Sequence, residues 1–199
     1  MTEDLALELA GTIRHDGHGG VADDLTVADG LTGWVRDRAD RLGSWAADFT
    51  ADEETHTRVL ALRAAVRALF ARAVLPGPPS PADAHRLLPF DEALRRVNAA
   101  AASVTVTLEL EWRPDGAGPT ARTTPAPVPA HDGLPAALAR ATVDFLAGPH
   151  RANLRACTAP RCVRYFVQGH GRQQFCKTSC GNRARAARHY ERHQNERPR

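Results

Sequence analysis

Residues 157–180, CTAPRCVRYFVQGHGRQQFCKTSC, hold all four cysteines of the 199-residue chain. The cysteines form two close pairs, Cys157/Cys162 and Cys176/Cys180, with thirteen residues between the pairs. Two short loops that each present two sulfurs to one point can enclose a zinc ion in a closed tetrahedron. Because four protein ligands leave no position for water, the spacing predicts one structural Zn²⁺ and no catalytic metal.

Three other interpretations of the cysteines are two disulfides, four unrelated buried thiols and an iron–sulfur cluster. Disulfides need an oxidising compartment, and the first residues, MTEDLALELAGTIRHDG, lack the basic and apolar regions of a signal peptide. No apolar run approaches the roughly 18 residues of a membrane span. We therefore expect a reduced, cytoplasmic chain with no membrane partner. Iron–sulfur ligands usually have other spacings, and His170 is not needed as a ligand, so zinc is favoured.

The segment after the fourth cysteine, GNRARAARHYERHQNERPR, predicts a helix over residues 181–194 because it is rich in Ala and Arg. A cysteine at the start of this helix is ionised more readily, since the positive end of the helix dipole faces its sulfur. Helical spacing places four basic residues on one stripe. They are Arg185, Arg188, His189 and Arg192.

The charge of the chain is divided between two opposed parts. Residues 150–199 contain twelve Lys or Arg and two Glu, a net charge of +10, whereas residues 1–149 carry −7. A basic helix beside a zinc site is the electrostatic footprint of a nucleic-acid-binding protein. Alternatively, the positive charges neutralise the net −2 of a tetrathiolate site, pair with the acidic first part, or form only a solvated face.

Residues 175–185, FCKTSCGNRAR, resemble the signature of the CGNR zinc finger family, which is named for the tetrad found here at 180–183. In that family a C-terminal finger follows an N-terminal domain called ABATE, and the proteins are described as stress-related transcription regulators. The resemblance extends to residues 5–13, 23–35 and 134–157. It implies that Cys157, Cys162, Cys176 and Cys180 bind zinc and that Arg183 contacts DNA. The chain departs from the family pattern at two places. Gly11 stands where the family usually has Asn, and Phe175 ends the finger's outer loop where the family usually has Trp.

Helices dominate the expected secondary structure. The residues Thr50-Ala51-Asp52-Glu53 form a capping-box pattern that predicts a helix running to about residue 74. Its predicted apolar stripe consists of Val59, Leu62, Val66, Leu69 and Phe70. Further helices are predicted over residues 25–40, from Ser80-Pro81 onward, over 91–102 and over 132–147. Residues 5–10 fit a strand or a helix, and the family resemblance favours the helix.

One β-hairpin is expected within this helical body. Residues 104–112, VTVTLELEW, alternate with the period of a strand, and a turn at 114–118 leads to a partner strand before Pro125. The predicted fold class is therefore α+β, mainly α. It comprises a helical domain over residues 1–149 with one small hairpin, and a treble-clef-like zinc module over residues 150–199 that ends in the basic helix. The expected boundary is Gly148-Pro149.

No catalytic pattern stands out, and we expect no enzyme. The sequence lacks a Gly-x-Ser-x-Gly elbow, a phosphate loop, a dinucleotide fingerprint and a His-Glu-x-x-His motif. Glu109 and Glu111 fit an exposed strand face better than a pair of catalytic carboxylates. The stretch HDGHGG at 15–20 fits a solvated turn better than a second metal site.

These observations favour a zinc-dependent DNA-binding transcription regulator, whose first domain has a sensing or dimerising role. The predicted nucleic-acid contacts are Arg183, Arg185, Arg188, His189 and Arg192. Because one small finger makes few contacts, sequence-specific binding would need a homodimer, and a small-molecule effector of unknown identity is expected. The alternatives are a zinc-stabilised module that docks on an acidic protein, an RNA-binding protein, and an enzyme whose site lies in the first domain.

Overall fold

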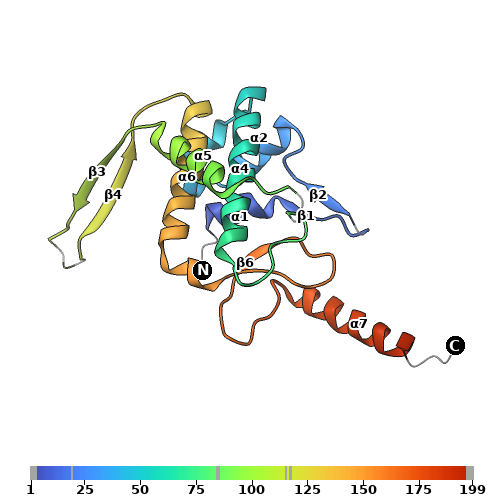
Figure 1. Cartoon of the computed structure of the whole chain (residues 1–199). Helices are drawn as coiled ribbons and strands as arrows, with labels where there is room; N and C mark the ends of the chain where they lie inside the picture. The colour runs from blue at the N-terminus through green and yellow to red at the C-terminus, as the bar shows by residue number, and fades with distance from the viewer. Residues whose placement is uncertain (1–3, 19, 84–85, 115, 117, 196–199) are drawn as a thin grey trace.

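Three helices form the centre of the molecule: α4 (Glu53–Ala73), α5 (Phe90–Ala102) and α6 (Ala130–Ala147) pack against one another (Figure 1). The computed structural model describes residues 4–18, 20–83, 86–114, 116 and 118–195. Helix α1 (Leu5–Gly11) packs on α6 and α4. This helix settles the choice between strand and helix at residues 5–10, and Asp4 caps it by accepting a hydrogen bond from the Ala6 amide.

The predicted core stripe of α4 is confirmed, because all five of its residues are buried. Phe70 is fully buried and packs against Phe145 of α6, with ring centroids 5.2 Å apart. The predicted capping box at Thr50 is wrong. Asp52 caps the helix by accepting from the Thr55 amide at 2.7 Å, and Thr50 instead accepts from the Arg36 side chain.

Two further helix predictions need correction. The helix expected over residues 25–40 is shorter, since α2 covers Ala28–Arg36 and is followed by α3 (Ala39–Leu42) and a 3₁₀ turn, η1 (Ser44–Asp48). Ser80-Pro81 does not begin a helix, because residues 81–83 form a turn. The Ser80 hydroxyl is fully buried and donates to the Val163 carbonyl at 2.8 Å, a contact with the C-terminal part of the chain.

The described residues contain three antiparallel two-stranded sheets. The predicted hairpin is present as β3 (Val106–Glu111) and β4 (Thr120–Pro125), and Arg122 pairs with both Glu109 and Glu111. The other two pairs were not predicted: β1 (Ile13–His15) with β2 (Val21–Asp23), and β5 (Leu154–Ala156) with β6 (Tyr165–Val167). In the turn between β1 and β2, Asp16 accepts from the amides of His18 and Gly20, as a solvated turn requires.

The C-terminal elements continue the same core and then leave it. After η2 (Pro149–Asn153), strands β5 and β6 bring Leu154 and Tyr165 into the core formed by the helices. Helix α7 (Thr178–Asn195) then extends away from the body (Figure 1). The fold class is thus α+β, mainly α, with a cysteine-rich module at the end. None of the helices described is long and apolar enough to cross a membrane.

Candidate metal centre and basic helix

The four cysteines converge on one point. Their sulfurs all lie within 4.8 Å of one another, and among the described residues they are the one group of this kind. The Cys176 sulfur is 3.6 Å from that of Cys162 and 3.5 Å from that of Cys180. Four thiolates around a zinc ion, each with a Zn–S bond of about 2.3 Å, lie about 3.8 Å apart. The cluster therefore fits a tetrahedral zinc ion.

The surroundings of the sulfurs also favour a bound dication. Three of the cysteines are buried, and Phe166 and Phe175 pack around them. Hydrogen bonding from Cys162 and Cys176 lowers the pKa of the Cys157 thiol, whereas pairing with Cys157 raises the pKa of Cys162 to about 11 and that of Cys176 further. The thiols of Cys157, Cys162 and Cys176 thus interact strongly, and a dication at their centre would favour the thiolate form of each.

Short backbone elements place the two cysteine pairs. Cys157 directly follows β5, and the loop to Cys162 closes with a hydrogen bond from the Cys162 amide to the Ala159 carbonyl. Arg161 adopts the left-handed conformation there, with φ of 63°, which a non-glycine residue rarely adopts. Cys180 lies in the first turn of α7, two residues after its start at Thr178. The helix therefore begins earlier than the predicted residue 181 and includes a sulfur ligand.

Arg183 differs from the other residues predicted to contact nucleic acid. Its side-chain nitrogen Nη2 lies 3.1 Å from the sulfur of Cys180, so its positive charge offsets the negative charge of that thiolate. A hydrogen bond that a non-ligand residue donates to a metal-binding sulfur orients that sulfur and adjusts its affinity for the metal. The structure thus brings Arg183 to the metal centre.

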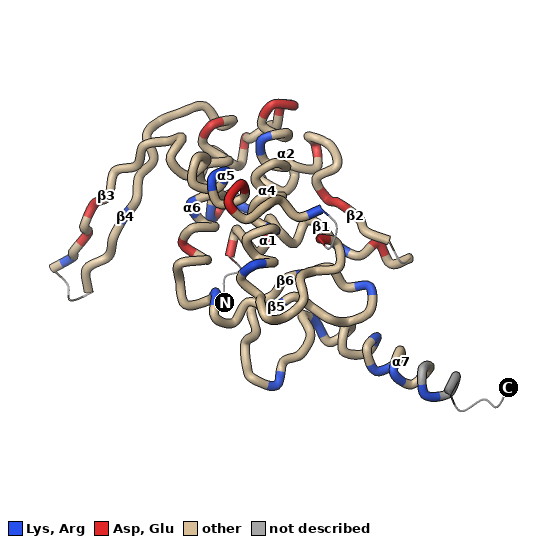
Figure 2. Tube along the Cα trace, viewed as in Figure 1, with Lys and Arg blue, Asp and Glu red and all other residues tan. Residues whose placement is uncertain are grey.

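The remaining four predicted contact residues lie on the exposed surface of α7. Arg185, Arg188, His189 and Arg192 are all exposed, and Figure 2 shows Lys and Arg gathered along this helix. The Nε of Arg188 donates to the carbonyl of Ala184, and that of Arg192 donates to the carbonyl of Arg188. Both guanidinium groups keep further donors available, so α7 presents a positively charged stripe that begins at the cysteine cluster.

A buried polar network joins this module to the helical body. Arg67 of α4 is only 2% exposed and forms a two-point ion pair with Asp83, at 2.7 and 3.0 Å. The same guanidinium donates to the Ala10 carbonyl and, at 3.2 Å, to the Val163 carbonyl. The Tyr165 hydroxyl donates to Asp83 at 2.8 Å, and burial followed by the Asp83 charge raises its pKa.

Together with Ser80, these residues form what we call the Arg67 network: Arg67, Ser80, Asp83, Val163 and Tyr165. It connects α4 to the loop just after Cys162, so the position of the cysteine cluster is tied to the core. The network was missed from the sequence. The available signal was a pair of arginines, Arg63 and Arg67, four residues apart on the face of the helix that carries the apolar stripe; both are buried.

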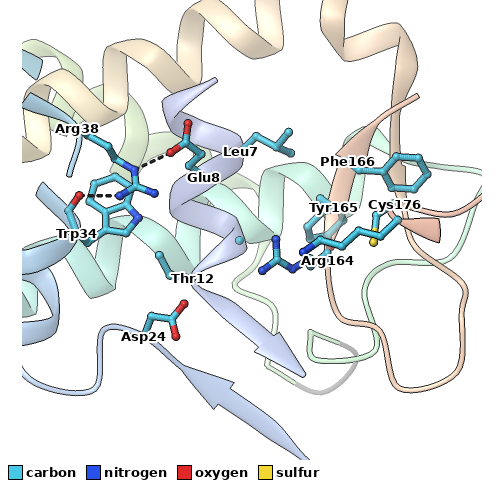
Figure 3. A pocket seen from close by; sticks show the side chains of 12 residues that line it. Leu7, Glu8, Thr12, Asp24, Trp34, Arg38, Arg164, Tyr165, Phe166 and Cys176 are labelled. Atoms are coloured by element: carbon cyan, nitrogen blue, oxygen red, sulfur yellow. Dashed lines mark hydrogen bonds and ion pairs between the residues drawn. The ribbon is translucent and has the colours of Figure 1, made fainter. Parts of the chain in front are cut away.

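A cavity of about 200 Å³ lies where the helical body meets the module (Figure 3). Its lining includes Glu8 of α1, Trp34 of α2, and Arg164 and Cys176 from the cysteine-rich segment. Glu8 is paired with Arg38 at 2.6 Å and also with Arg41. The Arg164 guanidinium has no hydrogen bond or ion pair with any described residue. This cavity therefore offers an available cation next to a metal-ligand candidate.

Two protein families match the chain. The ABATE family, described as "Putative stress-induced transcription regulator", matches residues 3–149, and the CGNR zinc finger family matches residues 153–193. A search of curated proteins finds no significant match. Neither matching family is an enzyme family, and their order along the chain is the one that the sequence resemblance implied. The four clustered cysteines lie inside the matched finger. The chain therefore belongs to the ABATE family and carries a C-terminal CGNR zinc finger.

Proposed function

We propose that this protein is a transcription regulator that binds DNA through a finger held by one structural zinc ion, with Cys157, Cys162, Cys176 and Cys180 as the ligands. The observation that carries this proposal is the exposed basic stripe of α7, which begins at the cysteine cluster. A helix fixed at one end by a metal site can present several cations to phosphates at low entropic cost.

In this proposal Arg185, Arg188, His189 and Arg192 contact DNA, largely through phosphates. Arg183 contributes from the base of the stripe, where part of its guanidinium is engaged by the Cys180 sulfur. The helical part over residues 1–149 has a sensing or dimerising role, and residues 150–199 form the DNA-binding part. Because zinc-binding thiolates persist where cysteines stay reduced, this function fits a protein of the cytoplasm.

We assign the expected small-molecule effector to the cavity between α1, α2 and the finger (Figure 3). Its size suits a small ligand, and Arg164 favours an anionic one. A ligand there would touch Glu8 and Trp34 of the body and Cys176 of the finger at once. Such contacts supply the differential binding through which an effector shifts a conformational equilibrium.

The test of the proposed function is DNA affinity at low salt for the zinc-loaded full chain. Replacing Arg185 and Arg188 with Ala should weaken binding at least about tenfold, because two phosphate contacts are lost. The matched control is Arg86→Ala with Arg95→Ala, which removes the same charge from exposed positions of the body and should leave affinity nearly unchanged. Equal loss in both variants would mean that only net charge matters and would contradict a contact role for α7.

Two alternatives are outcomes of the same experiment. RNA that competes more strongly than duplex DNA would favour an RNA-binding role, since an Arg-rich helix suits both nucleic acids. A zinc-loaded chain that binds neither nucleic acid at low salt would favour a helix that docks on an acidic protein.

A further inference from the structure

The β3–β4 hairpin exposes an apolar face that no part of the described chain covers. Every residue of both strands is exposed, and Figure 1 shows the hairpin reaching away from the helical body. Leu108 and Leu110 are each 72% exposed and Trp112 is 68% exposed. Isolated two-stranded hairpins are at best marginally stable in water, and contiguous exposed apolar residues usually mark an interaction site.

The two faces of the hairpin differ in chemistry. Directly opposite residues share a face, so the strand register places Ala121 beside Leu110 and Thr123 beside Leu108. We define the apolar arm face as Val106, Leu108, Leu110, Trp112, Ala121 and Thr123. The opposite face carries the charges, and there Arg122 is paired with Glu109 and Glu111 at 2.5 and 2.7 Å. The apolar arm face thus contains no charged side chain.

The hairpin is held firmly at its base although it is free along its length. Arg140 of α6 donates to the carbonyls of Ala101 and Val104, at the end of α5 and the start of the arm. The Ala126 amide donates to the Thr105 carbonyl at 2.8 Å. The arm therefore projects in a defined direction from the helical core, which lowers the entropic cost of docking.

We propose that the apolar arm face is the dimer interface of this protein and that it packs against the same face of a second copy. The choice of a second copy rests on the proposed function, because one finger offers few DNA contacts and two copies double them. It also rests on the chemistry of the face. A surface without charged groups has nothing to pair with a charged partner, whereas an apolar strip is complementary to itself across a twofold axis.

The available area is that of a small, weakly associating dimer interface. A Trp and three aliphatic residues at these exposures present on the order of 500 Å² per copy, compared with about 800 Å² per partner in a standard interface. Ala121, Thr123 and the backbone edges supply part of the remainder. Face-to-face packing of two hairpins at about 10 Å, the spacing of stacked sheets, would exclude water from both strips.

The test is the association state of the zinc-loaded full chain without DNA, measured by sedimentation equilibrium from about 1 to 100 μM, a range that covers weak association. The wild type should be a dimer in the upper part of this range. Leu110→Glu should weaken association at least about 100-fold, because dimerisation would bury a carboxylate in each copy. The matched control, Thr124→Glu, adds the same charge to the opposite face and should change association less than about threefold.

The emission of Trp112 gives a second measurement that does not depend on a disruptive variant. On dilution of the wild type through its dissociation range, the emission should shift to longer wavelengths as Trp112 returns to water. The shift should be absent in Trp112→Phe. A wild type that stays monomeric to 100 μM, or a dimer that Leu110→Glu leaves intact, would overturn the proposal.

The outcomes separate this proposal from the proposed function. A monomeric wild type with salt-sensitive DNA binding would overturn the dimer interface and leave the DNA role standing. A dimer that Leu110→Glu dissociates, in a protein that does not bind DNA, would support the interface while contradicting the DNA role.

Discussion

The hairpin β5–β6 packs into the core of the fold, whereas the hairpin β3–β4 projects from it. Each strand of β3–β4 has six residues, all of them exposed, whereas each strand of β5–β6 has three residues and contributes to the core. The longer hairpin has the clearer sequence pattern, yet it projects into solvent. The shorter one has no pattern of its own and is held by Leu154, by Tyr165 and by the Arg67 network.

This difference teaches that anchoring does not follow from strand length. The Tyr165 hydroxyl of β6 donates to Asp83, which is paired with Arg67 of α4. Arg67 also donates to the carbonyl of Val163, the residue after Cys162. The β3–β4 hairpin makes its polar contacts within itself and at its base. The β5–β6 hairpin therefore holds the finger in place, whereas the β3–β4 hairpin is free to contact a partner.

The largest expected effect comes from removing the metal. A chelator, or Cys176→Ser, should unfold the segment beyond β6 and abolish the helix of α7, because structural zinc contributes about 10–16 kcal/mol in zinc-finger peptides. The helices of the body should stay folded. Far-ultraviolet circular dichroism before and after chelation measures the change. Full retention of the α7 signal and of DNA binding without metal would contradict the assignment of the zinc site.

The next largest effect is expected at the anchor itself. Arg67→Met should lower the free energy of unfolding by about 3–5 kcal/mol, because Asp83 is left as a buried unpaired charge. Adding Asp83→Asn should recover part of this loss, and the double-mutant cycle gives the coupling between the two residues. Urea denaturation of the zinc-loaded proteins measures both. A loss below about 1 kcal/mol would mean that the network does not anchor the finger.

Tyr165→Phe tests a single contact of the same anchor. It removes the donor to Asp83 and the acceptor for the Ser80 amide, so stability should fall by about 1–3 kcal/mol. Tyr190→Phe is the matched control, because Tyr190 is exposed on α7 and its replacement should leave stability unchanged. Equal effects of the two substitutions in thermal unfolding would contradict the role given to Tyr165.

Acid should weaken the body through two partly buried ion pairs, Glu8 with Arg38 and Arg41, and Asp23 with Arg63. Burial raises the pKa of Glu8, but hydrogen bonds and charges from Arg41 and Arg38 outweigh it, so the pKa is lowered; Arg63 does the same for Asp23. A carboxyl with a depressed folded pKa stabilises the fold above its unfolded pKa, and this contribution is lost as pH falls through the folded pKa.

Glu8→Gln should therefore cost about 1 kcal/mol at pH 7 and less at pH 3, where the wild type has lost the same contribution. The unfolding free energies of both proteins across this pH range measure the difference. A gap that stays constant or grows toward low pH would contradict the ion-pair account.

The smallest effect is expected on the projecting hairpin. Leu108→Ser should change the unfolding free energy of the monomer by less than about 0.5 kcal/mol, because this side chain is largely in water already. The unfolding free energy should be measured at protein concentrations below those at which the dimer forms. A loss above about 1 kcal/mol would mean that the hairpin packs on its own body, and the contrast between the two hairpins would fail.

Much of the fold follows from local sequence patterns. The apolar stripe of α4, the helix at 91–102 and the alternation at 104–112 each contain their own signal, and the structure confirms them. Strands of three residues are too short for periodicity to reveal, so β1–β2 and β5–β6 were missed. The start of α4 was misplaced because Thr50 and Asp52 both suit a cap, and only the tertiary contact of Thr50 with Arg36 decides between them.

In the site, too, local patterns could be predicted and long-range contacts could not. The cysteine cluster could be predicted because two close cysteine pairs in one short segment are typical of a zinc site. The Arg67 network could not, because it joins residues as far apart as Arg67 and Val163, and nothing local specifies such a pairing. The proximity of Arg183 to the Cys180 sulfur likewise depends on where α7 begins.

The central claim is that the α7 stripe contacts phosphates in a zinc-dependent manner, and the dependence of DNA affinity on salt tests it most directly. With zinc content determined on the same sample, we expect about one zinc per chain and a steep loss of affinity with salt. In the variant with Arg185→Ala and Arg188→Ala, the slope of log affinity against log salt should become shallower by about 2, one for each lost contact. A slope unchanged in that variant, or no salt-sensitive binding by the zinc-loaded wild type, would contradict the claim.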